Sequence, residues 1–300
     1  IDGSSVGNIF VSAESAADIN VELDGSFNAE SLMVNAYGFI DWSSREAYPS
    51  TVSFLANGSA LNIYNLTESS EVSQASIILN GNVEIDGNIN VTARGGYYYD
   101  SSDALIAVES SSKLMGSSSG DSVYAEDSVL HDISVTSQNY GEAWVFLGGN
   151  ITVDGNVEIS ASGPYSSVDP SSSILSLDAV TFDHANLSVF ESGSDTAAVL
   201  NYQHLDGVID DLELQAQFGG SIDLVVDPQE NQIRMSGDIL VGANGYALAL
   251  FSADIDGSSL HSITVVAHDD AHSFVNLSGN ITVDRSEEHT SELQSRVDIS

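Results

Sequence analysis

The chain has 300 residues, of which 44 are acidic and only 6 are basic, for a formal net charge of -38. Such a surface repels nucleic acid phosphates and anionic membranes, so neither is expected as a partner. The absence of Cys excludes disulfides and thiolate metal sites, and no run of about 18 apolar residues could form a transmembrane helix. A hydrophobic share of 42% nevertheless predicts a folded chain rather than a disordered one.

Short strands with alternating apolar residues, separated by Gly, Asn, Asp and Ser, recur from the N-terminal region onward. One phrase makes the repetition visible: Gly81–Asn88 (GNVEIDGN) matches Gly149–Asn156 (GNITVDGN), and Gly279–Asp284 repeats most of it. Gly237–Val241 is a looser copy. No stretch has the periodicity of a long amphipathic helix, so the pattern predicts an all-β repeat protein.

Each repeat contains two strands that flank a loop rich in Gly, Tyr and Ser. The strand before the loop follows the pattern Asn/Asp-apolar-x-apolar, and the strand after it opens with a small residue. The pre-loop strands include Asn88–Val91, Asp132–Val135, Asn156–Ile159, Asn186–Val189, Asp211–Leu214 and Asp238–Val241. The post-loop strands begin near Val52, Ala75, Ala104, Ala143, Ser173, Ala197, Ile222, Ala247 and Ser273. Successive repeats start about 25 residues apart, with longer intervals where the loops are longer.

This period predicts a right-handed parallel β-helix (solenoid) with about 25 residues per turn. An antiparallel sandwich also places strands at short intervals and is the main alternative. The recurring small and Asn/Asp positions favour the solenoid, because equivalent residues of a solenoid stack at about 4.8 Å. Stacked Asn side chains would bond to one another between turns, and small residues would let the corner close.

Asn-Ile-Thr-Val-type strands and Asp-Gly-Asn turns in an acidic, Cys-free chain resemble the solenoid regions of bacterial surface adhesins. The likeness is to the filamentous-haemagglutinin and autotransporter-passenger kind, and it extends over most of residues 15–284. The resemblance implies export to the cell surface, where a rod holds an adhesive region away from the envelope. It implies no catalytic residue.

Two segments have formal resemblance to catalytic or metal motifs. Gly116–Gly120 (GSSSG) satisfies Gly-x-Ser-x-Gly, but it lies in a Ser-rich run without the following helix that a nucleophile elbow needs, so a loop is expected. His268–His272 (HDDAH), with His261 nearby, brings imidazoles and carboxylates together. Its spacing aligns ligands only on a helix, whereas a solvated polar loop is expected here.

Carboxylate pairs such as Asp210 with Asp211 and Asp254 with Asp256 suggest acid–base chemistry or calcium binding. Adjacent pairs also arise by chance among so many acidic residues, and both the nine-residue calcium repeat and the EF-hand loop are absent. We therefore expect no cofactor, with bound Ca²⁺ as the open alternative. A polysaccharide-active lyase or hydrolase remains the alternative function, although its basic groups would have to come from scattered residues.

Aromatic residues concentrate in the loops between pre-loop and post-loop strands, which would emerge along one edge of a solenoid. Exposed rings there would stack on sugars or on a protein partner, whereas rings folded back would only cover the flank. The consecutive side chains of Tyr97, Tyr98 and Tyr99 cannot all point inward. The predicted contact surface consists of Trp42, Tyr97, Tyr98, Tyr99, Tyr140 and Tyr165, and Tyr48 and Tyr246 occupy loops of the same class.

The two ends of the chain differ from the repeat. The chain starts at Ile1 without an initiator Met or signal peptide, so we expect a fragment of a larger protein. After Asp284 the strand rhythm stops, and Arg285–Ser295 (RSEEHTSELQS) resembles a translated sequencing adapter. We expect residues 1–284 to be one solenoid domain and residues 285–300 to be a non-native tail.

Together these features predict a structural and adhesive repeat region rather than an enzyme. Its expected location is extracellular or at the cell surface. The expected partners are a host or matrix glycan or protein, and the neighbouring repeats of the same chain.

Overall fold

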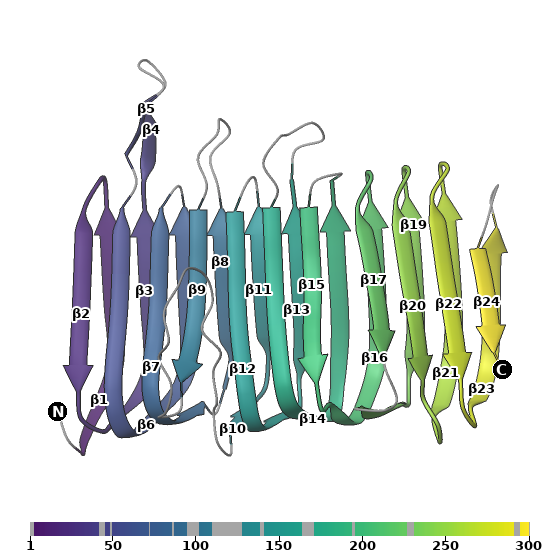
Figure 1. Ribbon diagram of the computed structural model, residues 1–300, viewed down its shortest axis with the longest axis horizontal. Coiled ribbons are helices and arrows are strands. Elements are labelled where there is room, and N and C mark those ends of the chain that lie inside the picture. Colours follow the sequence, from purple (N-terminus) through teal and green to yellow (C-terminus); the bar gives the residue numbers. More distant parts are fainter. Residues whose placement is uncertain are drawn as a thin grey trace.

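The computed structural model describes residues 3–41, 46–48, 50–71, 73–85, 87–94, 102–109, 128–138, 141–163, 171–193, 196–226, 231–290 and 295–299. This part of the chain is all-β, with strands stacked as a right-handed parallel solenoid whose equivalent positions are roughly 25 residues apart (Figure 1). The predicted fold class is therefore confirmed. The sandwich alternative is wrong, because the ladders between turns are all parallel and the one described antiparallel pair is a small hairpin.

Each turn of the chain has a front strand, a short lower segment and a back strand. In Figure 1 the front strands run downward and the back strands run upward as the chain advances from left to right. The front face consists of β2 (Asp18–Asp24), the first parts of β6 (Thr51–Glu71), β7 (Gln74–Ile85), β12 (Gly141–Val153) and β14 (Ser171–Ser192), and β9 (Ser102–Glu109), β15 (Thr196–Gln203), β17 (Ser221–Val226), β20 (Leu248–Asp254), β22 (His272–Ser278) and β24 (Ser295–Ile299).

The back face is a continuous parallel ladder. It consists of β1 (Ser4–Glu14), β3 (Phe27–Tyr37), the end of β6, β8 (Ile89–Arg94), β11 (Ile133–Gln138), β13 (Asn156–Ser162), the end of β14, and β16 (Asp206–Gln217), β19 (Asp238–Asn244), β21 (Ser259–His268) and β23 (Thr282–Thr290). Two short strands, β10 (Ser128–Leu130) and β18 (Gln232–Met235), belong to the lower segment. The hairpin β4 (Phe39–Asp41) and β5 (Glu46–Tyr48) projects at the upper edge.

The interior is built from the inward positions of every strand. In β8 and β11 buried and partly exposed residues alternate, so that Val91 and Val135 stack in register within the core. Burying each such side chain stabilises the fold by about 1.5–3 kcal/mol. No single turn can bury these side chains alone, because each core layer is covered by the turns before and after it.

Small residues stand in register where most front strands begin, as predicted, with Val52 and Ile222 as larger members of the same column. The in-register column runs through Ala75, Ala104, Ala143, Ser173 and Ala198. The positions in register are Ala198 and Ala249, one and two residues after the predicted Ala197 and Ala247. A second small-residue column closes the upper end of the back face, with Ala93, Ser137 and Ala161 in register.

The segment after Asp284 continues the ladder. Strand β23 runs from Thr282 to Thr290 and pairs with β21, and β24 pairs with β22. The open end of a parallel ladder offers backbone N–H and C=O groups to any sequence, so this pairing does not depend on the residues that follow Asp284. The boundary after Asp284 stays a prediction.

Candidate functional site

A polar corner separates the lower segment from the back face. It is formed by the residue that precedes the apolar-x-apolar pattern of the back strands, which is Asn or Asp in most turns, as the sequence pattern predicted, and Ser in two. The polar corner comprises Asn8, Ser31, Asn88, Asp132, Asn156, Asn186, Asp211, Asp238 and Ser262. Asn8, Ser31 and Ser262 were not predicted, although each precedes the same apolar-x-apolar pattern as the others.

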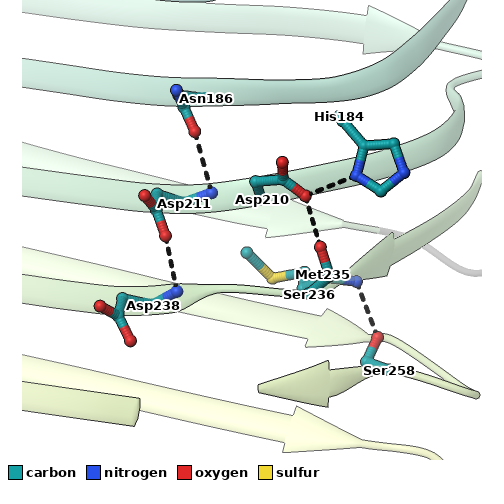
Figure 2. A network of polar contacts seen from close by, with 8 residues as sticks. All are labelled: His184, Asn186, Asp210, Asp211, Met235, Ser236, Asp238 and Ser258. Atoms are coloured by element: carbon teal, nitrogen blue, oxygen red, sulfur yellow. Dashed lines mark hydrogen bonds and ion pairs between the residues drawn. The ribbon is translucent and has the colours of Figure 1, made fainter. Parts of the chain in front are cut away.

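Hydrogen bonds join the polar corner from turn to turn. Asp132 accepts the backbone amide of Asn156 at 2.8 Å, and Asn186 donates its side-chain amide to Asn156 Oδ1 at 3.0 Å. In the next turns Asn186 Oδ1 accepts the amide of Asp211 at 3.3 Å, and Asp211 Oδ1 accepts the amide of Asp238 at 2.8 Å (Figure 2). The chain bends here, so a short side-chain acceptor replaces a ladder bond that the backbone alone does not make.

Glycine precedes the corner residue where the backbone of the previous turn approaches closely. A Cβ atom on Gly155 would overlap the carbonyl of His131, and one on Gly237 would overlap the carboxylate of Asp211 and the carbonyl of Asp210. The recurring Asp-Gly-Asn phrase therefore has a steric cause, since only Gly leaves room for this contact.

Histidine and aspartate pair beside the polar corner. His131 Nδ1 lies 2.5 Å from Asp154 Oδ1, and His184 Nδ1 lies 2.8 Å from Asp210 Oδ1. Ser236 also donates its hydroxyl to Asp210 (Figure 2). This hydrogen bond is the largest cause that lowers the pKa of Asp210; partial burial opposes it, and His184 and His261 lower the pKa further.

The His184, Asp210 and Ser236 side chains do not form a nucleophilic triad. Activation of a serine requires that its hydroxyl donate to the imidazole, whereas Ser236 donates to the carboxylate. Asp210 with a lowered pKa is an acceptor of hydrogen bonds rather than a proton donor. The arrangement links three successive turns.

A shallow groove runs along the outside of the polar corner in the C-terminal half. Its polar lining consists of Asn156, Asn186, Ser188, Asp211, Glu213, Asp238, Ser262 and Thr264. Acidic and amide oxygens dominate this lining, and it contains no Lys, Arg or His. The groove is therefore able to accept hydrogen bonds from hydroxyl or ammonium groups.

The carboxylates suggested as calcium ligands form hydrogen bonds to residues of neighbouring turns. Asp210 bonds to His184 and Ser236, while Asp211 accepts the amide of Asp238. Asp256 likewise accepts the amide of Asn280 at 2.7 Å. Within the described ranges, no group of three or more His, Asp or Glu side chains is arranged to hold a metal ion. The calcium alternative stays a prediction.

The His268–His272 segment contains the turn between β21 and β22, in agreement with the loop interpretation, and all its residues except the buried Ala271 are exposed. Asp269 and Asp270 have left-handed φ angles of 55° and 62°, and the ring of His272 stacks on Phe274 with centroids 6.3 Å apart. The Gly116–Gly120 segment lies outside the described residues.

The loop edge is the upper edge of Figure 1, where back strands end and front strands begin. The six predicted contact residues, Trp42, Tyr97, Tyr98, Tyr99, Tyr140 and Tyr165, lie outside the described residues. Of the other two, Tyr48 is half-buried and Tyr246 is 71% exposed. The structure adds Phe218, which is 48% exposed in the preceding turn and was missed because it follows β16 without interruption.

Phe218 and Tyr246 occupy adjacent stacked turns. The amide of Phe218 bonds to Asn244 O at 2.9 Å, and the amide of Tyr246 bonds to Asp269 O at 3.1 Å. Both aromatic residues have left-handed φ angles, 50° and 60°. This conformation costs about 1 kcal/mol for a bulky residue, whereas Gly at the same position would avoid the cost.

Comparisons with protein-family models, with curated proteins and with solved structures found no match to this chain. In the described part of the chain no helix is long and apolar enough to cross a membrane.

Proposed function

We propose that this chain is a structural and adhesive repeat region of a secreted or cell-surface protein. In this role the solenoid is a stalk, and its loop edge is a contact surface. The observation that supports the proposal best is the polar corner, which joins turn after turn by hydrogen bonds along the back face.

A stalk must resist bending and must not collapse on itself. Each turn contacts only its neighbours, so stiffness follows from the interior core and from the bonds between turns. The net charge of -38 adds repulsion between distant parts of the rod and between separate rods. These properties favour an extended, well-separated particle.

The loop edge supplies the contact surface in this proposal. Phe218 and Tyr246 expose aromatic faces in adjacent turns at a cost in backbone strain. Strain that persists without a gain in packing is found at functional sites. Exposed aromatic rings stack on sugar rings and on protein partners, so we propose a host or matrix glycan or protein as the ligand.

We propose a non-catalytic role. The groove beside the polar corner collects carboxylates without a basic neighbour in its lining. A lyase needs a cation to neutralise a substrate carboxylate, and a glycosidase needs a paired acid and base. The properties of this groove support a contact surface over a reaction site.

Two measurements test the proposal on the whole chain. Small-angle X-ray scattering at increasing ionic strength should give the profile of a rod with constant cross-section, and a compact particle would contradict the stalk. Binding to a panel of matrix proteins and neutral glycans should then fall at least tenfold in Phe218→Ala and Tyr246→Ala. The matched control is Tyr64→Ala, an exposed tyrosine away from the loop edge at 50% exposure. Equal losses in all three variants would contradict the assignment of the loop edge.

A further inference from the structure

The front face is interrupted between β15 and β17, while the back face is continuous. The strands β17, β20, β22 and β24 form a separate sheet of 4 strands, distinct from the sheet of 18 strands that contains β15. Among the described pairings β15 joins β14 and β17 joins β20. In the same turns β16 pairs with both β18 and β19. The result is an interruption of the front ladder between β15 and β17, which we call the slit.

Packing is looser at the slit. Leu200 and Tyr202 of β15 occupy inward positions but are only half-buried, whereas their register partners Leu175 and Leu177 are fully buried. An apolar cavity of about 20 Å³ lies beside them in the interior, lined by side chains of β15 and β17 and of the lower and back strands. Loss of contacts around such a void weakens the packing of the residues that line it.

Glu191 bridges the slit from the back face. Its register partners in the adjacent turns are Ala161 and Ala216, so a carboxylate stands in a column of small residues. The side chain is buried, with 3% exposure. Glu191 Oε2 accepts the amide of Ala198 on β15 at 3.0 Å, and Oε1 accepts the amide of Ser221 on β17 at 2.9 Å. The carboxylate thus replaces the missing ladder bond.

Only uncharged groups face this carboxylate in the described residues. They are the amides of Ala198 and Ser221, the hydroxyl of Thr196 at 3.3 Å, and the two alanines in register. Asp195, in the connecting loop, lies outside the described residues. Burial raises the pKa of Glu191, and the hydrogen bonds from Ser221, Ala198 and Thr196 oppose this rise.

The sign of the pH effect follows from this burial. A raised pKa means that the closed slit binds a proton more tightly than the open slit, where the carboxyl group is solvated. The free energy by which protonation of Glu191 stabilises the closed slit is therefore fully present below the ordinary pKa of a glutamate. It is lost as the pH rises through the raised pKa. The intact back face holds the two parts together in either state.

We propose that the slit between β15 and β17, bridged by Glu191, is a joint where the front face opens, less often at mildly acidic than at neutral pH. The continuous back face acts as the spine. The rod is then more compliant at neutral pH and stiffer in acid.

Hydrogen–deuterium exchange of the whole chain at pH 7.5 and pH 5, corrected for intrinsic exchange, tests the proposal. Amides of β15 and β17 should be less protected at pH 7.5 than at pH 5, by about tenfold for each unit by which the raised pKa exceeds 5. Amides of β16 and β19 on the back face are the internal control and should keep their protection. The proposal would be overturned if protection changed equally with pH on both faces, or if the amides of β15 and β17 exchanged faster at pH 5 than at pH 7.5.

A variant assigns the effect to Glu191. Glu191→Gln cannot titrate, so the difference between the two pH values should vanish in β15 and β17. Glu213→Gln, an exposed carboxylate on the adjacent β16, is the matched control and should keep the wild-type difference. If Glu191→Gln keeps that difference, another group drives it and the proposal fails. Should Glu191→Gln not fold, the wild-type comparison of the two faces still decides.

Discussion

The polar corner and the slit both join turns through side-chain hydrogen-bond acceptors, but they do so in different ways. At both places a side-chain oxygen of one turn accepts a backbone amide of a neighbouring turn. At the corner a partly exposed Asn or Asp accepts the amide, and the arrangement repeats from turn to turn. At the slit a single buried glutamate accepts two amides at once. The corner acceptors are solvated and recur, whereas the slit relies on one buried carboxylate, whose desolvation is offset by the amides that it accepts.

The first prediction concerns packing and has the largest expected effect. Ile239 is fully buried in the back face beyond the polar corner, whereas Leu200 lines the slit and is half-buried. Ile239→Ala should destabilise the chain by about 2–5 kcal/mol, and Leu200→Ala by about 1 kcal/mol, because less contact is lost there. Denaturant unfolding measures both. Equal losses would mean that the slit is as well packed as the back face.

The second prediction concerns the steric requirement of the corner. Gly237→Ala should cost about 1–3 kcal/mol, because its Cβ would overlap Asp211 and the carbonyl of Asp210. Gly7→Ala is the control, since no atom lies within 4 Å of a Cβ there. Thermal unfolding of the two variants should separate them clearly, and a tolerated Gly237→Ala would contradict the close approach of the turns.

The third prediction concerns the hydrogen bonds of the corner. Asn186 donates to Asn156 and accepts from Asp211, so Asn186→Ala should cost about 1 kcal/mol. Ser188→Ala, two residues along the same strand in the outward position, should change the free energy of unfolding little. Urea titrations of both variants provide the measurement. No difference between them would mean that solvent replaces the corner bonds at no cost.

The fourth prediction, with the smallest effect, compares pH dependence. The lowered pKa of Asp210 means that its contribution to stability is present above its unfolded pKa and is lost as the pH falls through the lowered value. Glu191 acts in the opposite direction, because its pKa is raised. The free energy of unfolding should fall less between pH 7 and pH 3 in Asp210→Asn than in the wild-type chain. An unchanged profile would show that Asp210 contributes nothing measurable at this exposed site.

Most of the fold was predictable from local patterns. The apolar alternation around Ile133 and Val135, the Asp132 that precedes them and the small residue at Ala143 follow one another within a few residues. Their recurrence at a near-constant interval distinguishes stacked turns from a sandwich. The corner bonds were predictable for the same reason, because a recurring Asn or Asp at one position of a turn must face its copy in the next.

The missed residues lack such a repeat. Phe218 continues the inward alternation of Leu214 and Ala216, and the turn signal Gly219-Gly220 comes only after it, so the alternation placed Phe218 inside the strand. Glu191 follows Phe190 at what looks like the solvated end of a strand. Its column holds small residues in the neighbouring turns, but alignment of the turns requires the ladder register.

The sequence by itself determined the all-β class, the period of the turns and the polar column at the corner, because each is written in residues that are close together in the chain. Only the tertiary structure decided which face is continuous, where the front face is interrupted and that Glu191 reaches two strands across the core. The physical reason is that alternation within a strand is local, whereas register between turns depends on packing and loop length over roughly 25 residues.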